Sequence, residues 1–361
     1  MTITEIRHTL HNNPGISGNE LFAHDLIVRE LQALKPDVIH DHVGGFGVVA
    51  LWRSREEKAT TLAFRADIDA LPSGHRCGHD GHTAILLRFA QMVSEDKDRK
   101  HNIVLVFQPE EETGKGAKKI MESGILQEIG IDAIFGLHNL PGYDKGTVVL
   151  SRGTFSMASC GVIYKLTGRQ THASTPEMGL NPGLAAAEII QRFDALNNME
   201  PSKFRMSTLI CCNVGERAFG TSAGKGEVMF TLRTMSNDGM STLMQAADDI
   251  VNEVSRKYCL GLEKQVCEPF RALENNPELV DEMKTLFSRD YTVMELEKPF
   301  RWSEDFAEYL TEFRGAFFGL GSGKEQPELH HPNYDFPDDI IETGANCFKR
   351  INTLTYQHIN N

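Results

Sequence analysis

Three short apolar runs in the sequence each lead into polar residues that could hold a metal ion. Thr61–Phe64 leads toward Asp69, Ile103–Phe107 into three consecutive glutamates, and Ala133–Leu137 into His138. Runs of this length are typical of buried strands, and in an open parallel sheet the carboxyl ends of the strands border one crevice. We therefore expect these side chains to converge, although they are far apart in the sequence.

A cysteine and a histidine, Cys77 and His79, stand two residues apart in a segment that also contains Gly78 and Gly81. Thiolate and imidazole are good ligands for zinc, manganese, cobalt or nickel. The glycines allow the backbone to approach its neighbours closely. Such a pair is weak evidence by itself, but beside acidic strand ends it indicates a metal site.

The three consecutive acids Glu110, Glu111 and Glu112 could form only a solvated run of charge. They follow an apolar run, however, and precede Gly114 and Gly116. One carboxylate can bind a metal while its neighbour accepts a proton from the activated water that amide hydrolysis requires. The pattern favours metal-assisted hydrolysis.

Helical and strand-like patterns alternate along the first part of the chain. Residues 17–34 have the spacing of an amphipathic helix, and Val48–Trp52 is a further strand-like run. Helical segments around His82–Val93 and Ala117–Ser123 lie between the apolar runs. This alternation predicts an α/β domain with a largely parallel sheet and helices on both faces.

The pattern changes near residue 158 to the order βαββαβ, which suggests a ferredoxin-like unit. Its expected elements are Gly161–Leu166, Pro182–Asn197, Met206–Val214, Glu227–Arg233, Met240–Tyr258 and Leu262–Cys267. The α/β character returns after Pro277, with a helix near Glu278–Phe287, an apolar run at Ala316–Leu320 and a closing helix near Pro337–Thr355.

At 361 residues the chain is long enough for two domains. We expect a catalytic domain in two parts, residues 1–157 and 271–361, interrupted by a smaller α+β domain at residues 158–270.

Composition narrows the class of partner. A net charge of −13 disfavours nucleic acid and anionic membranes, which reward a basic face. The sequence has no long apolar span and no secretory start, so we expect a cytoplasmic protein with a small-molecule substrate. Seven cysteines without a C-x-x-C pair suggest neither a disulfide framework nor a structural zinc site.

An ordered set of motifs resembles the M20 metallopeptidase family over nearly the whole chain. The branch is that of hippurate hydrolases, N-acyl-amino-acid and auxin-conjugate amidohydrolases, and N-acetyl-diaminopimelate deacetylases. The motifs are Asp-Ile-Asp-Ala-Leu-Pro from Asp67, Cys-Gly-His-Asp-Gly-His from Cys77, Gln-Pro-Glu-Glu-Glu from Gln108, Gly-Leu-His-Asn-Leu-Pro from Gly136, Gly-Arg-Gln-Thr-His-Ala from Gly168, Glu-Asp-Phe from Glu304 and Leu-His-His-Pro from Leu329.

The resemblance implies two divalent metal ions, zinc, manganese, cobalt or nickel, with Cys77 as the thiolate that they share. It implies Glu111 as the general base, and Asp69 and Asp80 as carboxylates that orient the ligands. The remaining ligands would be His79, Glu112, His138 and His330. His82 is expected to pack on a helix face near the site, and His331 is left without a ligand role.

The smaller domain would act as a lid and as the contact surface of a homodimer. In this family the histidine at the position of His172 lies over the substrate carbonyl, and Arg233 would face the substrate carboxylate or support the lid. Two departures concern substrate recognition. Only residues 73–76 separate the first two motifs, where the family has a longer segment, and Gly220-Thr-Ser-Ala223 stands where the family tends to have Asn-x-Ile-Pro.

These observations predict a metal-dependent amidohydrolase that cleaves a small N-acyl amino acid or a related substrate. One alternative is a cysteine hydrolase in which His79 or His138 activates Cys77 as the nucleophile. Another is a non-catalytic binding protein on the same scaffold. A zinc nucleobase deaminase is disfavoured, because the Pro-Cys-x-x-Cys half of its signature is absent.

Overall fold

The computed structural model describes residues 1–200 and 203–354 and divides the chain into two compact units. The larger unit contains Met1–Phe155, Leu273–Glu297 and the described residues from Glu304 onward, and the smaller unit contains Ser156–Ala272 and Lys298–Ser303. The two main junctions lie within two residues of the predicted boundaries.

The prediction that residues 271–361 all belong to the larger domain is wrong for Lys298–Ser303. This short segment is held to the start of the smaller unit by hydrogen bonds. The Met157 N–H donates to the Phe300 carbonyl (3.0 Å), and the Ser303 hydroxyl donates to the Met157 carbonyl (2.7 Å). Contacts so distant in sequence leave no local signal.

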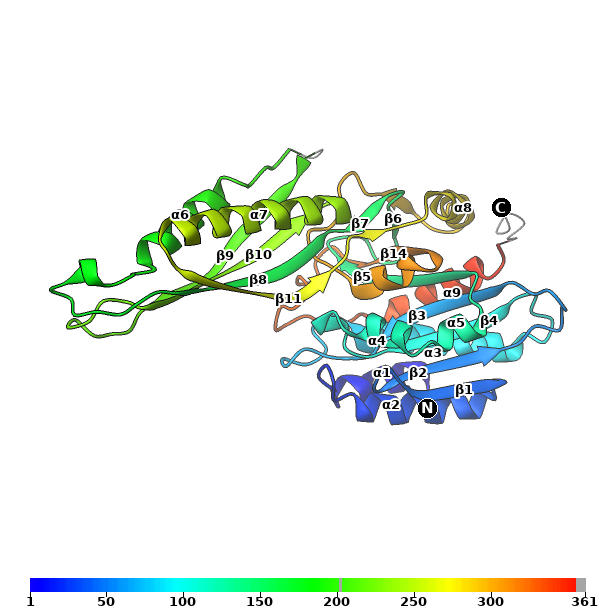
Figure 1. Ribbon diagram of the computed structural model, residues 1–361. Helices are drawn as coiled ribbons and strands as arrows, with labels where there is room; N and C mark the ends of the chain where they lie inside the picture. Colours follow the sequence, from blue (N-terminus) through cyan, green and yellow to red (C-terminus); the bar gives the residue numbers. More distant parts are fainter. Residues whose placement is uncertain (201–202, 355–361) are drawn as a thin grey trace. The chain divides into compact units, whose positions relative to one another are not determined.

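The larger unit is built on an eight-stranded sheet of order β1-β2-β4-β3-β5-β14-β6-β13 (Figure 1). Its strands are β1 (Val38–Val43), β2 (Gly47–Trp52), β3 (Thr61–Asp67), β4 (Asn102–Gln108), β5 (Ala133–Pro141), β6 (Val148–Leu150), β13 (Val293–Glu295) and β14 (Arg314–Gly323). Parallel pairs join β4 to β3, β3 to β5, β5 to β14 and β13 to β6. The predicted, largely parallel α/β sheet is confirmed, and β2 is a strand that runs antiparallel to β4.

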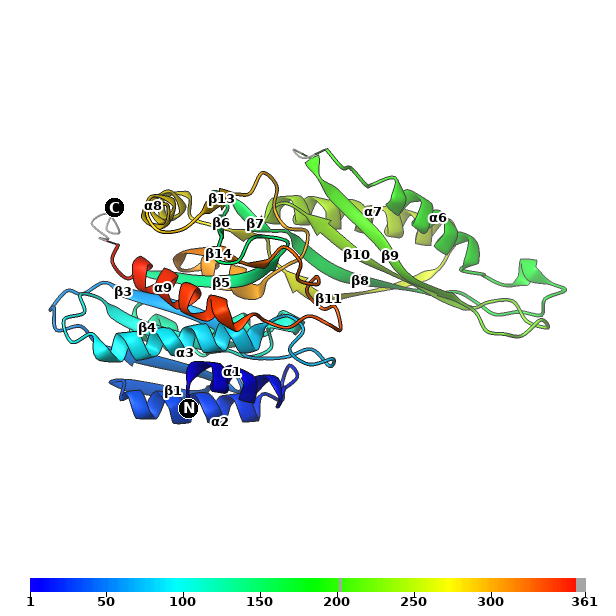
Figure 2. The same ribbon diagram turned by 180° about the vertical axis from the view of Figure 1, so that it is seen from behind.

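Helices cover both faces of this sheet (Figures 1 and 2). On one face α3 (His79–Glu95) lies beside α1 (Ile3–His11), α2 (Leu21–Leu34) and α9 (Ile341–Ile351), with α8 (Pro277–Phe287) next to α9. On the other face α4 (Gly116–Glu122) packs against α5 (Ile125–Ile129) and the 3-10 helix η4 (Asp305–Thr311). Two short strands, β7 (Thr154–Ser156) and β12 (Leu273–Glu274), form a separate pair.

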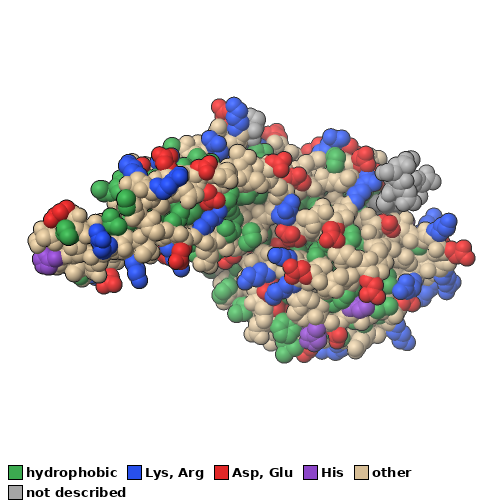
Figure 3. Space-filling model, viewed as in Figure 1, with side chains coloured by type: hydrophobic (Ala, Val, Ile, Leu, Met, Phe, Trp, Pro, Cys, Tyr) green, Lys and Arg blue, Asp and Glu red, His purple; other side chains and the backbone are tan. Residues whose placement is uncertain are grey.

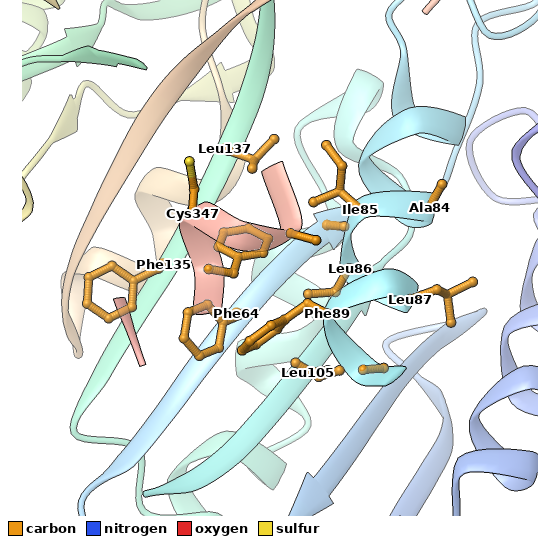
Figure 4. Close-up of a cluster of buried hydrophobic side chains, with 14 of the residues drawn as sticks. Phe64, Ala84, Ile85, Leu86, Leu87, Phe89, Leu105, Phe135, Leu137 and Cys347 are labelled. Carbon is orange, nitrogen blue, oxygen red and sulfur yellow. The ribbon is translucent and has the colours of Figure 1, made fainter. Parts of the chain in front are cut away.

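Aromatic rings fix α3 and α9 to the sheet. The ring centroid of Phe64 on β3 lies 4.7 Å from that of Phe89 on α3, 5.7 Å from Phe135 on β5 and 5.2 Å from Phe348 on α9. Figure 4 shows Phe64, Phe89 and Phe135 among aliphatic side chains of α3, β4 and β5. Burial of such a ring contributes roughly 1.5–3 kcal/mol. This packing sets the position of the amino-terminal end of α3, where Cys77 and His79 lie.

The smaller unit has the predicted order βαββαβ. Its elements are β8 (Ala158–Thr167), α6 (Gly183–Asp194), β9 (Arg205–Val214), β10 (Lys225–Thr234), α7 (Asn237–Lys257) and β11 (Gly261–Phe270). The four strands form an antiparallel sheet of order β11-β8-β10-β9, the ferredoxin-like arrangement. Its core includes the rings of Phe193 on α6 and Phe230 on β10, whose centroids are 4.2 Å apart at an interplanar angle of 31°.

Charges of both signs are mixed on the face shown in Figure 3. None of the helices in the described ranges combines the length and the apolar character that a membrane crossing would need.

Candidate metal centre

Cys77 is shared by two groups of side chains whose ligand atoms lie within 4.8 Å of one another. The first group is Cys77, His79 and His138, and the second is Cys77, Glu112 and His330. The thiol lies 3.5 Å from His138 Nε2 on β5. These five residues come from the start of α3, the 3-10 helix η1 (Glu111–Thr113), strand β5 and the loop after β14. The structure therefore brings together all five predicted ligands.

Glycines allow this close assembly. Gly78, between Cys77 and His79, has φ +98°, and a Cβ atom there would lie 2.5 Å from the side-chain oxygen of Asn139. A Cβ at Gly81 would lie 2.3 Å from the ring of Phe336. Any larger residue would push α3 away from β5 or from the loop that contains Phe336.

His330 rather than His331 joins the group. Its Nε2 atom is 3.7 Å from Glu112 Oε2, and its backbone has φ +67° and donates an N–H to the Arg76 carbonyl (2.8 Å). The ring of His331 instead accepts the N–H of Asn333 (3.1 Å). The left-handed backbone at His330 gives these neighbouring rings different directions.

Two buried ligand atoms are unpaired, which tests whether the site suits a metal. His79 Nε2 and Glu112 Oε1 lie 3.8 Å apart and have no hydrogen-bond partner within residues 1–200 and 203–354. His79 Nδ1 lies 3.0 Å from the carbonyl of Asp69, so this nitrogen donates, and in the neutral ring Nε2 has a lone pair for a metal. Unpaired buried polar atoms are costly, and a cation between them would remove that cost.

Two of the acidic ligands, Cys77 and Glu112, hold their protons to higher pH than usual in the absence of a cation. Burial raises the pKa of the Cys77 thiol well above its usual range and raises the pKa of Glu112 to about 7. Burial lowers the pKa of His138, which keeps this imidazole neutral and able to bind a metal. A bound cation would favour the thiolate and the carboxylate. Sulfur, imidazole and carboxylate donors together fit a divalent transition metal.

Asp69 contacts two of the five ligands. Its Oδ1 atom lies 3.2 Å from His79 Nδ1, and its Oδ2 atom accepts the N–H of Glu112 (3.1 Å) and the hydroxyl of Ser17 (2.7 Å). Asp80 has different partners, because it accepts from Arg7 (3.2 Å), from His11 (2.8 Å) and from the Gly81 N–H (3.0 Å). Asp69 is therefore placed to orient the ligands His79 and Glu112 directly. The contacts of Asp80 named here include none of the five ligands.

A buried pair, His82 and Asp67, lies beside the ligands, and only the place of His82 was expected from the sequence. His82 on α3 lies with Nδ1 2.6 Å from Asp67 Oδ1 and with Nε2 2.5 Å from Asn139 Oδ1. Asp67 Oδ2 is in turn 3.7 Å from His79 Nε2. The expected packing of His82 near the site agrees with this position. The sequence does not reveal that Asp67 is the polar partner of His82, because the alternation of residues along β3 does not show which buried acid meets which histidine.

Beneath the ligands lies a buried ionic cluster that sequence reasoning missed. Arg65 on β3 is 1% exposed and donates to Asp67 (2.7 Å), Glu304 (2.9 Å), Asp305 (2.9 Å) and Gln108 (2.8 Å). Burial raises the pKa of Asp305, and the guanidinium of Arg65 opposes that shift. A charged residue inside an apolar strand is the signal that could have revealed it.

His172 and Arg233 lie in the smaller unit. His172 is exposed, and its Nδ1 atom accepts the N–H of Ser174 (3.1 Å), so in the neutral ring the proton is on Nε2. A bridge to Thr221 holds the His172 loop against the β9–β10 hairpin. Arg233 on β10 donates to the carbonyl of Arg301 (2.6 Å), and burial lowers its pKa.

A second histidine cluster, His24, Asp41 and His42, is also compact. The two imidazole rings stack with centroids 4.2 Å apart and an interplanar angle of 23°. An ion must lie near the plane of each imidazole that binds it, and two stacked rings do not share such a point. We interpret this cluster as packing between α2 and β1.

Known proteins with the same fold include relatives that are described as hydrolases. An uncharacterized hydrolase of Staphylococcus aureus (strain bovine RF122 / ET3-1) is 26% identical, with 97% of each chain covered. The crystal structure of a protein from methicillin-resistant Staphylococcus aureus has a TM-score of 0.89 at 24% identity and covers 98% of this chain and 96% of its own. The Bacillus subtilis YXEP protein, described as a dinuclear metal-binding peptidase of the M20 family, has a TM-score of 0.83 at 23% identity and covers 97% of this chain and 96% of its own.

The fold and the site together are those of a metal-dependent hydrolase. The model of the peptidase family M20/M25/M40 matches residues 63–353, and the chain belongs to this family.

Proposed function

We propose that this protein hydrolyses the amide bond of a small N-acyl amino acid or a related N-acylated substrate. The observation that carries the proposal is the pair of three-residue groups that share Cys77, beside the carboxyl group of Glu111. Four donors around one thiolate suit two divalent ions, zinc, manganese, cobalt or nickel, held by Cys77, His79, Glu112, His138 and His330. When bound, these ions supply electrophilic activation of the water and of the substrate carbonyl.

Glu111 is the proposed general base. Its Oε2 atom lies 3.9 Å from His79 Nε2, and its side chain is 8% exposed. Burial raises the pKa of Glu111 well above its usual range, and the nearby Glu304 and Glu112 raise it further. A carboxylate with increased proton affinity can take a proton from the attacking water and then deliver it to the leaving amine.

Cys77 is better suited to hold a metal than to attack the substrate. Catalytic cysteines have a lowered pKa, because a nearby cation or a helix amino terminus stabilises the thiolate. Cys77 lies just before the amino terminus of α3, but burial and the neighbouring Glu112 raise its pKa more than the contact with His79 lowers it. This supports the hydrolytic proposal over a cysteine nucleophile.

We further propose a homodimer in which His172 of one chain serves the active site of the other. The Nε2–H of His172 is an exposed donor suited to the oxygen of a substrate carbonyl, where negative charge develops during hydrolysis. Arg233 is the proposed partner of a substrate carboxylate or the support of the lid. A cytoplasmic location is supported by the seven free cysteines, which are typical of a reducing compartment.

A panel assay tests the proposal. Metal-depleted protein would be reloaded separately with zinc, manganese, cobalt and nickel, and offered N-acetyl, N-benzoyl and aminobenzoyl amino acids. We expect metal-dependent release of the free amino acid, and loss of that release in Glu111→Gln. Metal-bound protein that hydrolyses none of the panel would favour the non-catalytic alternative, and activity that survives chelation but not thiol alkylation would favour the cysteine mechanism.

A further inference from the structure

The loop between α1 and α2 contributes a buried carboxylate to the turn that presents the metal-site glutamates. Glu20 is fully buried, and its Oε1 atom accepts two backbone N–H groups, from Gly18 (2.8 Å) and from Glu110 (3.0 Å). Glu20 is the N-cap residue of α2, yet its side chain makes no capping hydrogen bond to that helix. The carboxylate is directed instead to a turn that is 90 residues away in sequence.

Glu110 needs this support because its backbone is left-handed, with φ +53° and ψ +34°. Residues with a side chain adopt this conformation only when their surroundings hold them there. The Glu110 carbonyl accepts the N–H of Gly116 (3.2 Å), its carboxylate pairs with Lys119, and its N–H is held by Glu20. The turn at Glu110 sets the direction in which Glu111 and Glu112 leave strand β4.

A second carboxylate, Asp69 after strand β3, acts on the same turn and is bound by a residue of the α1–α2 loop. Asp69 accepts the N–H of Glu112 (3.1 Å) and is itself held by the hydroxyl of Ser17 (2.7 Å). Glu20 and Asp69 therefore hold the backbone on both sides of Glu111, and both contact residues 17–20. Hydrogen bonds that orient a ligand in this way commonly change metal affinity about 10–100-fold when removed.

We propose that Glu20 is a positioning residue of the metal centre, which directs Glu112 into the site by fixing the N–H of Glu110. The inference rests on the proposed role of Glu112 as a ligand. It assigns no contact between Glu20 and the metal or the substrate.

The burial of Glu20 favours a functional role over a purely stabilising one. Its Oε2 atom is buried and has no hydrogen-bond partner in the described parts of the chain. Burial raises the pKa of Glu20 to about 7, so an ionised carboxylate is unfavourable for folding at this position. A group that is costly to bury and is aimed at the metal-site turn is explained by what it positions.

Metal affinity in a double-mutant cycle tests the proposal. The affinity of metal-depleted full-length protein for Zn²⁺ would be measured by competition with a chromophoric chelator in wild type, Glu20→Ala, Glu112→Gln and the double variant. Glu20→Ala should weaken the weaker-bound ion or both ions by about 10–100-fold. In the Glu112→Gln background, Glu20→Ala should cause almost no further loss of metal affinity, because the side chain that Glu20 positions no longer binds metal.

Two further variants separate positioning from general stability. Glu20→Gln keeps an oxygen acceptor and should retain affinity within about 3-fold of wild type. Asp25→Ala removes an exposed acid from the next turn of α2 and should change nothing. If Glu20→Ala does not fold, Glu20→Asp takes its place in the cycle, since it keeps the charge but is too short to reach Glu110.

The outcomes are distinct. Wild-type affinity in Glu20→Ala, or an equal loss in both backgrounds, would overturn the positioning role while leaving the ligand role of Glu112 intact. Unchanged affinity in Glu112→Gln alone would overturn the ligand assignment itself.

Discussion

Removal of Arg65 should destabilise the larger unit strongly. Its guanidinium is 1% exposed and is the shared partner of Asp67, Glu304 and Asp305, all of which are at most 2% exposed. Arg65→Met keeps much of the volume but leaves three buried carboxylates without their cation. Breaking one buried pair in this way typically costs about 3–5 kcal/mol. In a domain of roughly 150–250 residues, 1 kcal/mol lowers the melting temperature by about 2–4 °C, so we expect a decrease of about 6–20 °C.

The direction of the pH dependence follows from the same contacts. Without Arg65, burial and mutual repulsion raise the pKa of these carboxyl groups in the folded state above their unfolded values. The folded variant then binds more protons than the unfolded chain, so its stability falls as pH rises, and its deficit should be larger at pH 8 than at pH 5. Calorimetry at both pH values measures the deficit.

The matched control is Arg152→Met. Arg152 pairs with Asp281 at 3.1 Å, but these side chains are 63% and 54% exposed. A surface pair contributes about 0–1 kcal/mol, so its melting temperature should change by less than about 4 °C. A decrease in Arg65→Met no larger than in this control, or one independent of pH, would refute the assignment of the cluster as mutually compensated charge.

Two further predictions concern the reaction. Glu111→Gln should keep its metal and lose activity by about 10²–10⁴-fold, because an amide cannot accept the proton from water. Glu112→Gln should instead lose metal. If metal analysis and turnover assays gave the two variants the opposite results, the roles assigned to Glu111 and Glu112 would be wrong. His172→Ala should lower turnover by about 10²–10³-fold with unchanged metal content. If the site is shared between chains, a mixed dimer of the His172→Ala and Glu111→Gln variants has one intact site. Mixing equal amounts of the two variants under conditions of subunit exchange should therefore restore roughly a quarter of wild-type activity per chain. Demonstrated exchange without recovery would exclude the shared site.

Much of the fold was predictable because each element has a local pattern. The buried runs that became β3, β4 and β5, and the order βαββαβ of the smaller unit, follow from hydrophobic periodicity and turn residues. Strand β1 was missed, because half of its side chains are polar and it lies at the edge of the sheet, paired with β2. The segment Lys298–Ser303 was assigned to the wrong unit, since only contacts with residues near Met157 define its place.

The site was predictable only where one residue type indicates its chemistry. Cys77, His79 and the glutamates are conspicuous in the sequence, and the structure brings them together. The contacts of Glu20 and Arg65 were not predictable. A buried glutamate that holds a distant backbone N–H, or an arginine inside a strand, depends on neighbours far along the chain. Asp80 shows the same limit, because its partners are Arg7 and His11.

Metal stoichiometry tests the central claim most directly. Metal-depleted wild type, Cys77→Ala and the control Glu111→Gln would each be saturated with zinc, manganese, cobalt or nickel, freed of excess metal and analysed for metal per chain. Two tightly bound ions are expected in wild type and in Glu111→Gln, as in a two-metal hydrolase, and both should be weakened in Cys77→Ala because one thiolate serves both groups. Metal content near zero in wild type with every metal, or two ions retained in Cys77→Ala, would contradict a centre built around a shared Cys77.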